Sequence, residues 1–207
     1  MAAKKKPASK TKPAKKTTAK KKAPAKKRAA PPRKAATPGT LGPIQKAIAA
    51  SLRDGSPKFW LVKSEPDVFS IDDLRRDGET TWEGVRNYTA RNFMRDGMSL
   101  GDLVLYYHSN AEPSGIVGVA RVSGMAEPDP HQFDPKSDYY DAESKKSDPR
   151  WLMVRVAFEK KLPRTLTLDE LKADPALGGM LVIQKGQRLS VQPVEKAHFE
   201  RVLTIAR

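Results

Sequence analysis

A short stretch of the chain, residues 81–93, brings an aromatic side chain, a glycine and two arginines to the predicted start of a helix. Asn87 is expected to cap this helix, because its side chain can accept a backbone N–H of the first turn and apolar residues follow at helical spacing. Free N–H groups and the helix dipole favour an anion there. Trp82 would lie in the loop before the helix, beside Arg86 and Arg91, and this combination suits a nucleotide. The alternative is that Trp82 anchors the core and both arginines face solvent.

The first 40 residues form a basic tail. They contain 13 lysines, 2 arginines and no acidic residue, and they lack Val, Ile, Leu, Phe, Trp and Tyr. Such a segment cannot bury enough apolar surface to offset its ordering entropy, so we expect it to be disordered. Its closely spaced cations predict salt-sensitive, sequence-independent binding to phosphates. The expected phosphate contacts are Arg86 and Arg91 of the domain and, in the tail, Lys4, Lys5, Lys6, Lys15, Lys16, Lys20, Lys21, Lys22, Lys26, Lys27 and Arg28.

The Lys/Ala/Pro units of this tail resemble the C-terminal tails of linker histones and of bacterial histone-like proteins. A tail that only solubilises the protein, or that serves as a nuclear address, is the alternative. Residues 41–207 carry 24 basic and 24 acidic side chains, so the net charge of +15 belongs to the tail. Any basic patch on the rest of the chain must therefore come from local arrangement.

Composition also excludes several kinds of chemistry. The chain has no cysteine, which excludes disulfides, thiolate nucleophiles and cysteine-ligated metals. No metal-ligand or cofactor motif is present, so we expect neither a metal nor a cofactor. No apolar run of membrane-spanning length and no signal peptide is found. These features predict a monomeric intracellular protein without a membrane partner, associated with the nucleoid in a bacterium or located in the nucleus of a eukaryote.

For the rest of the chain, hydrophobic patterning predicts a linker at 41–57, which can include a short helix, and one domain at 58–207. A long polar segment, 126–150, reads as either a lid or a disordered loop. The other predicted elements are strands at 58–63, 103–108, 116–122 with a bulge or close approach at Gly118, 151–158 and 187–194, and helices at 71–76 capped by Ser70, 167–173 capped by Thr167, and 195–204. The strands at 103–108 and 116–122 are expected to pair as a hairpin. In the last helix we expect His198 on the surface and four apolar residues turned partly inward: Ala197, Phe199, Val202 and Leu203. The fold class expected is α+β: a mostly antiparallel, curled sheet forming a pseudo-barrel with short flanking helices.

Several spaced motifs between residues 58 and 206 resemble those of one known family. They are Phe59-Trp-Leu-Val-Lys-Ser-Glu-Pro66, Trp82-Glu-Gly-Val-Arg-Asn-Tyr-Thr-Ala-Arg-Asn92, Gly101-Asp102 with Tyr106-Tyr-His-Ser109, Gly115-Ile-Val-Gly118, Tyr139-Tyr-Asp141 and Ser190-Val-Gln-Pro-Val194. In these motifs and their order the chain resembles the EVE domain, a PUA-like family related to the YTH and ASCH domains. Glu83 is a small departure, since aspartate is common there.

The resemblance implies a PUA-like β-barrel with a pocket that accepts a modified nucleobase, either a modified cytosine or similar base in DNA or a modified base in RNA. Carried over by position, the candidate pocket residues are Lys63, Ser64, Glu65, Trp82, Val85, Arg86, Asn87, His108, Ser109, Tyr140, Ser190, Val191, Gln192 and Pro193.

The function expected is a two-part binder: the tail holds nucleic acid without sequence preference, and the pocket samples single bases. One buried methyl group contributes only about 0.8 kcal/mol, so real selectivity requires polar groups that the wrong base would leave unpaired. One alternative is a hydrolase using His108 with Ser109, or Lys63 with Glu65, although no catalytic motif supports it. The other is a compaction protein in which the domain merely folds.

Overall fold

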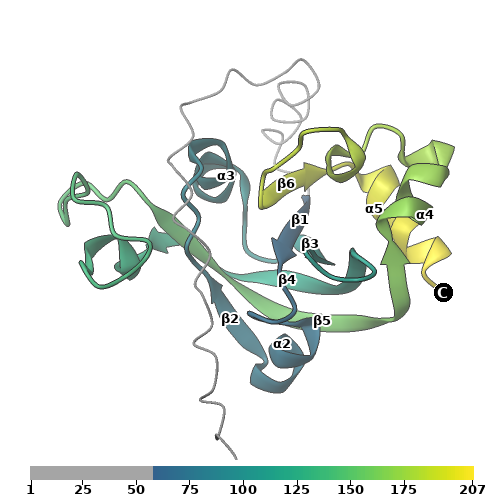
Figure 1. Cartoon of the computed structure of the whole chain (residues 1–207), viewed down its shortest axis with the longest axis horizontal. Helices are drawn as coiled ribbons and strands as arrows, with labels where there is room; N and C mark the ends of the chain where they lie inside the picture. The colour runs from purple at the N-terminus through teal and green to yellow at the C-terminus, as the bar shows by residue number, and fades with distance from the viewer. Residues whose placement is uncertain (1–57) are drawn as a thin grey trace, which may run out of the picture. The chain divides into compact units, whose positions relative to one another are not determined.

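The computed structural model describes residues 58–207, so the predictions for the tail and for the linker lie outside the described residues. The described part is α+β, with six strands in one sheet and short helices around it (Figure 1). The strands are β1 (Phe59–Ser64), β2 (Glu79–Trp82), β3 (Leu103–His108), β4 (Gly115–Pro128), β5 (Leu152–Thr167) and β6 (Val191–Val194). The α-helices are α2 (Ile71–Asp77), α3 (Tyr88–Asn92), α4 (Leu168–Ala173) and α5 (Lys196–Ile205), and short 3₁₀ or π turns span Phe93–Gly97, Pro130–Phe133, Pro175–Leu177 and Leu181–Ile183.

The strand order is β2-β5-β4-β3-β1-β6, and only the β1–β3 pairing is parallel. The predicted hairpin of β3 and β4 and the mostly antiparallel sheet are therefore confirmed. β6 lies at one edge of the sheet, next to β1. This position explains how Pro193, which has no N–H to donate, is tolerated within a strand.

Two strands differ from the sequence-based prediction. β2 was read as part of a loop, because Glu-Thr-Thr-Trp carries only one large apolar residue, but it pairs with β5 from Glu79 to Trp82. β5 continues to Thr167, well past the predicted end at 158, through a stretch that reads as charged and includes Pro163. Pairing with β4 along most of its length holds this polar stretch in the sheet.

Gly118 marks an irregularity where β4 meets β5, as predicted. The register between the two strands shifts on both sides of it. A Cβ atom at Gly118 would lie 2.6 Å from Cδ1 of Ile71 and 2.9 Å from the carbonyl oxygen of Lys160. The missing side chain therefore lets α2 lie directly against the sheet.

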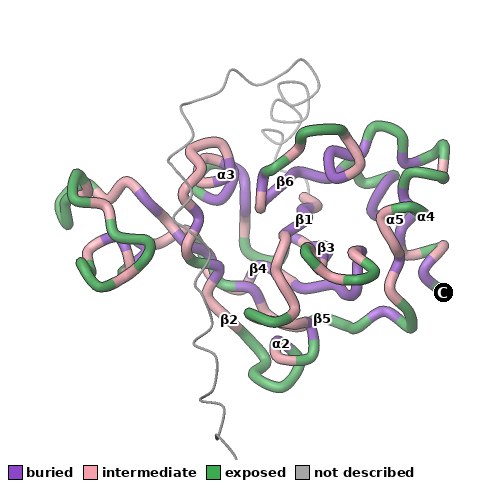
Figure 2. Tube along the Cα trace, in the orientation of Figure 1, coloured by how far each residue is buried: buried purple, intermediate pink, exposed green. Residues whose placement is uncertain are grey.

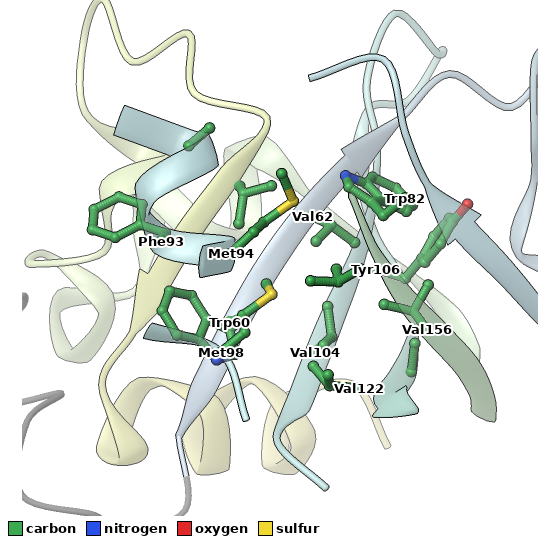
Figure 3. Packing of buried hydrophobic residues seen from close by; sticks show 14 of the residues in the cluster. Trp60, Val62, Trp82, Phe93, Met94, Met98, Val104, Tyr106, Val122 and Val156 are labelled. Atoms are coloured by element: carbon green, nitrogen blue, oxygen red, sulfur yellow. The ribbon is translucent and has the colours of Figure 1, made fainter. Parts of the chain in front are cut away.

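Apolar side chains form two clusters. The larger includes Trp60, Tyr106 and Trp82, together with Phe93 and Met94 from the α3 region (Figure 3). The other lies under the C-terminal helices and includes Leu61, Leu105, Leu171, Phe199 and Val202. Alternate residues of the central strands β1 and β3 feed the two clusters, which is the period-two pattern expected of a sheet covered on both faces.

The helix caps follow the sequence prediction closely. Ser70 and Asp73 form a capping box at α2, Thr167 and Glu170 form one at α4, and Asn87 caps α3. In α5 two side chains differ from the prediction. His198 is buried rather than on the surface, and Ala197 is exposed rather than turned inward, because the helix meets the core through a face centred on Phe199 and Val202. Within residues 58–207 no helix is long and apolar enough to cross a membrane.

Candidate nucleic-acid interface

The sequence had suggested that Trp82 lies in a loop. In the structure it is the last residue of strand β2. Its side chain belongs to the larger core cluster, 9% of the residue is exposed, and its ring meets Tyr106 edge-on at 5.7 Å (Figure 3). No described residue accepts a hydrogen bond from its indole N–H, yet this nitrogen is not among the enclosed atoms that lack a partner. Trp82 is thus a core anchor whose ring faces are largely covered, while its indole N–H has no partner among the described residues.

Arg86 is held by the protein itself. Its guanidinium donates to Oδ2 of Asp129 at 2.7 Å, to the carbonyl of Val85, and twice to the carbonyl of Tyr139 at 2.9 and 2.6 Å. These contacts engage four of the five N–H groups of the arginine, and 11% of the side chain is exposed. Arg86 therefore joins the loop before α3 to segment 126–150. Its expected contact with a phosphate stays a prediction.

Asp129 is fully buried and is the node of this region. Besides Arg86, its carboxylate accepts the backbone N–H of Gly84 at 3.0 Å and that of His131 at 2.9 Å. Gly84 has a φ of +73°, and a Cβ atom there would lie 2.8 Å from the ring of Tyr139. Only glycine suits both the backbone conformation and the close approach.

Gln132 organises segment 126–150 through its buried amide. The amide donates to the carbonyls of Asp129 and Trp151 and accepts from the N–H of Trp151 and the hydroxyl of Ser144. Asp141 adds a hydrogen bond to the indole N–H of Trp151 at 2.7 Å. The segment is therefore an ordered loop with its own polar core, projecting beyond the ends of β4 and β5 (Figure 2). We call Gly84, Arg86, Asp129, Gln132 and Trp151 the Asp129 cluster.

A second group of candidates meets at the C-terminal ends of β1 and β3 and the start of β6. The carbonyl of Ser64 accepts the N–H and the hydroxyl of Ser109, and the N–H of Lys63 donates to the carbonyl of Ser190. The hydroxyl of Ser64 donates to the carbonyl of Phe69 at 2.7 Å. We call the group the strand-end cluster: Lys63, Ser64, Glu65, His108, Ser109 and Ser190.

His108 is satisfied as a neutral side chain. Its Nε2 accepts the backbone N–H of Ile71 at 3.1 Å, which supports the first turn of α2. Burial lowers the pKa of His108, and Lys161 acts in the same direction, while Asp72 opposes both. Because the Nε2 lone pair is already occupied, His108 is poorly placed to act as a general base with Ser109.

Glu65 and Lys63 do not form an ion pair in any contact between the described residues. Glu65 accepts a hydrogen bond from the amide of Asn110, which has a φ of +53°. Lys63 donates to the carbonyl of Gln187 at 3.3 Å and lies 5.9 Å above the ring centre of Tyr107. In residues 58–207 no group of acidic or histidine side chains is arranged to hold a metal ion.

Tyr106 links the two groups of candidates. Its ring contacts Trp82, and its hydroxyl donates to the carbonyl of Phe69, which also accepts from Ser64. Burial raises the pKa of Tyr106 to about 12, so the hydroxyl keeps its proton. The structure thus connects Trp82 to the strand-end cluster through a side chain that the sequence had not selected.

The other candidates fall into four groups. Asn87 uses its carbonyl oxygen to cap α3, which leaves its amide N–H groups without a partner in the described chain. Val85, Val191, Pro193 and Gln192 are buried, and the amide of Gln192 donates to the carbonyl of Leu189. Arg91 donates to the carbonyl of Arg150 and lies over Tyr88, and burial lowers its pKa. Tyr140 is 44% exposed on segment 126–150.

The prediction missed Asp129, Gln132 and Tyr139, which hold the site together. Their partners lie far away in the sequence, so spacing gave no direct signal. The closest signal was composition: a long acidic loop that nevertheless contains Phe133, Tyr139 and Tyr140.

A six-stranded mixed sheet with short helices around it defines a domain of the PUA-like class. The sequence matches the EVE domain over residues 58–205, and the chain belongs to this family. It is 43% identical to thymocyte nuclear protein 1 of Gallus gallus over 164 residues, which cover 70% of this chain and 67% of that protein. The human protein of the same name is 42% identical, with 70% and 72% covered.

Comparison with solved structures supports the same family assignment. A protein from Pseudomonas putida is 44% identical with a TM-score of 0.70, and the match covers 72% of this chain and 99% of that one. Human THYN1 protein, solved in complex with DNA containing 5-methylcytosine, is 39% identical with a TM-score of 0.68 over 72% of this chain and 98% of that one. The P. putida match also indicates that a chain consisting of the domain alone folds.

Proposed function

We propose that this chain binds nucleic acid and that its EVE domain holds one modified base, of the 5-methylcytosine kind, at the site between Trp82 and the strand-end cluster. The observation that carries the proposal is the complex of human THYN1 protein with DNA containing 5-methylcytosine, at 39% identity over the whole domain. The site of this chain supplies groups suited to that task. The indole N–H of Trp82 and the amide of Asn87 are donors without a partner in the described protein.

Free donors matter because burial of the methyl group alone discriminates poorly. One methyl group contributes about 0.8 kcal/mol, a factor of about four in affinity. A polar group left unpaired by the wrong base costs about 1–3 kcal/mol. We therefore infer that selectivity for the kind of base depends on Trp82, Asn87 and the strand-end cluster, whereas the methyl group adds a smaller preference.

Net affinity in this proposal comes largely from the basic tail. Extracting a base from a duplex costs a few kcal/mol, and contacts at one pocket roughly offset that cost. Phosphate contacts by the lysines of residues 1–40 supply affinity that falls steeply with salt. The proposal includes a monomer that acts on DNA or RNA, in a nucleoid or a nucleus.

The test compares residues 58–207 with the full chain. Binding of each is measured at fixed salt to oligonucleotides that differ only in one modified or unmodified cytosine. We expect both proteins to prefer the modified oligonucleotide, the full chain to bind more tightly, and its dissociation constant to depend more steeply on salt.

Equal affinity of residues 58–207 for the two oligonucleotides would overturn the proposal for the domain. If deletion of residues 1–40 removed all binding, the chain would instead be a compaction protein whose domain has another task. Asn87→Asp keeps the helix cap while replacing the free amide donor, so it is a variant that tests the site without removing the cap.

A further inference from the structure

Five aromatic and arginine side chains, among them Arg86 of the loop that follows Trp82, form a continuous series of contacts. The guanidinium carbon of Arg86 lies 5.2 Å from the ring centre of Tyr139 and 5.4 Å from that of Trp151. Trp151 and Tyr88 stack at 4.8 Å with 31° between their planes, and Arg91 lies 4.9 Å from the ring centre of Tyr88. We call this stack the aromatic–arginine ladder.

The outer end of the ladder is open. Tyr139 is 45% exposed and, with Tyr140, it is one of two strongly exposed aromatic side chains in residues 58–207. Its carbonyl accepts two N–H groups of Arg86, and its ring lies against Gly84, two residues after Trp82 in the chain. The ring is therefore exposed and fixed in place beside the candidate base site.

We propose that Tyr139 is a stacking surface for the base that neighbours the modified base in the bound nucleic acid. The inference rests on the proposed function and extends it from one base to two. Every base has a flat π-face, so stacking on an aromatic ring tolerates any sequence. A ring that Arg86 already holds loses little conformational freedom on binding, which favours such a contact.

The charge of the loop indicates that the contact is to a base and not to the phosphate backbone. Segment 126–150 carries seven acidic and four basic residues. Those basic residues include Arg150, which already pairs with Glu143 and Asp141. Phosphates would be repelled by such a loop, whereas an uncharged base is not.

The test uses the full chain and short fluorescein-labelled oligonucleotides with one 5-methylcytosine. In one oligonucleotide the neighbouring nucleotide on either side is replaced by an abasic site. Tyr139→Leu removes the flat ring but keeps an apolar side chain, and Tyr139→Phe keeps the ring. We expect Tyr139→Leu to weaken binding about fivefold, the low end for base stacking, and Tyr139→Phe to bind as the wild type does.

The abasic oligonucleotide gives the decisive comparison. We expect it to bind the wild-type chain about fivefold more weakly and to bind Tyr139→Leu with no further loss, because both changes remove the same contact. The slope of affinity against salt should be unchanged in Tyr139→Leu, since no phosphate contact is lost.

Two results would overturn the inference. Independent, additive losses from the substitution and from the abasic site would mean that Tyr139 acts through the loop and not through that base. No loss from Tyr139→Leu, with its thermal unfolding unchanged, would mean that the exposed ring serves another partner, such as a protein. If the wild-type chain showed no preference for 5-methylcytosine, that result would contradict the proposed function instead. The contact of Tyr139 could then still be tested by the same abasic comparison in oligonucleotides with unmodified cytosine.

Discussion

The strand-end cluster and the Asp129 cluster flank the same candidate site but are held in different ways. In the strand-end cluster, main-chain groups of β1, β3 and β6 form most of the bonds, as with the carbonyl of Ser64 and the N–H of Ser109. In the Asp129 cluster, the bonds run through two buried side chains, Asp129 and Gln132. The first cluster should tolerate loss of single side chains, whereas the second depends on very few.

This difference has a physical origin. Main-chain bonds persist whatever the side chain is, so the sheet itself keeps the strand ends in register. Beyond the end of β4 at Pro128, segment 126–150 is not paired with a strand of the sheet. Its buried polar groups must therefore satisfy one another. Removing one member then leaves several others unpaired.

The largest loss of stability is expected from Asp129→Asn. The substitution preserves size but leaves the guanidinium of Arg86 largely buried without its counterion, and breaking a buried ion pair costs about 3–5 kcal/mol. We expect the free energy of unfolding in urea to fall by about 3 kcal/mol. Asp138→Asn, an exposed position of the same loop, should change it by less than about 0.5 kcal/mol. Similar values for the two variants would contradict the role of Asp129 as a node.

Gln132→Ala should have the next largest effect. It removes four hydrogen bonds and leaves the buried N–H of Trp151 without a partner, while the carbonyl of Trp151 keeps only the backbone N–H of Asp129. A loss of about 2 kcal/mol is expected from unpaired buried groups, measured by chemical unfolding. Gln184→Ala, which removes one exposed hydrogen bond, is the matched control. A loss no larger than that of the control would show that the loop does not need its polar core.

Ser64→Ala probes the strand-end cluster. It removes the hydrogen bond of the Ser64 hydroxyl to the carbonyl of Phe69 and its longer contact with the carbonyl of Glu65, but leaves the main-chain bond from the N–H of Ser109 to the carbonyl of Ser64. We expect a loss of about 1 kcal/mol, with hydrogen exchange of the Ser109 amide as slow as in the wild type relative to global unfolding. Selective acceleration of that amide would mean that side chains, not the sheet, hold the strand ends.

The smallest expected effect is the pH dependence due to His108. Its pKa is lowered in the folded protein, so below the unfolded pKa of about 6.5 the unfolded chain binds more protons and stability falls. Between pH 7 and 6 this contribution is at most about 0.7 kcal/mol. It should be absent in His108→Gln, which can still accept the N–H of Ile71. Identical pH profiles for wild type and variant would show that His108 does not titrate differently on folding.

Local signals in the sequence were enough to predict much of the fold. Ser70, Asn87 and Thr167 were identified as helix caps from their types and spacing, and Gly118 as a point of close approach. These features involve neighbours in the sequence or a residue type with one dominant use. β2 was missed because four mostly polar residues become a strand only through pairing with β5.

The site was less predictable than the fold. The motifs selected Trp82 and Arg86 correctly as residues of one region, but the sequence could not show that Asp129 and Tyr139 occupy the guanidinium. His198 was misplaced because helical spacing alone does not say which neighbours cover a helix. Contacts between residues far apart in the chain carry the information that was missing.

The place of β1 between β3 and β6 has a consequence for how the domain is made. β1 is the first strand of the described chain and β6 the last, so the sheet cannot be completed until residues 191–194 have left the ribosome. Contacts between residues so far apart in the sequence slow folding, because the chain loses the entropy of closing a long loop before the contact stabilises it. We expect a nascent chain lacking β6 to expose the apolar edge of β1, and chaperone binding to such truncated chains would report it.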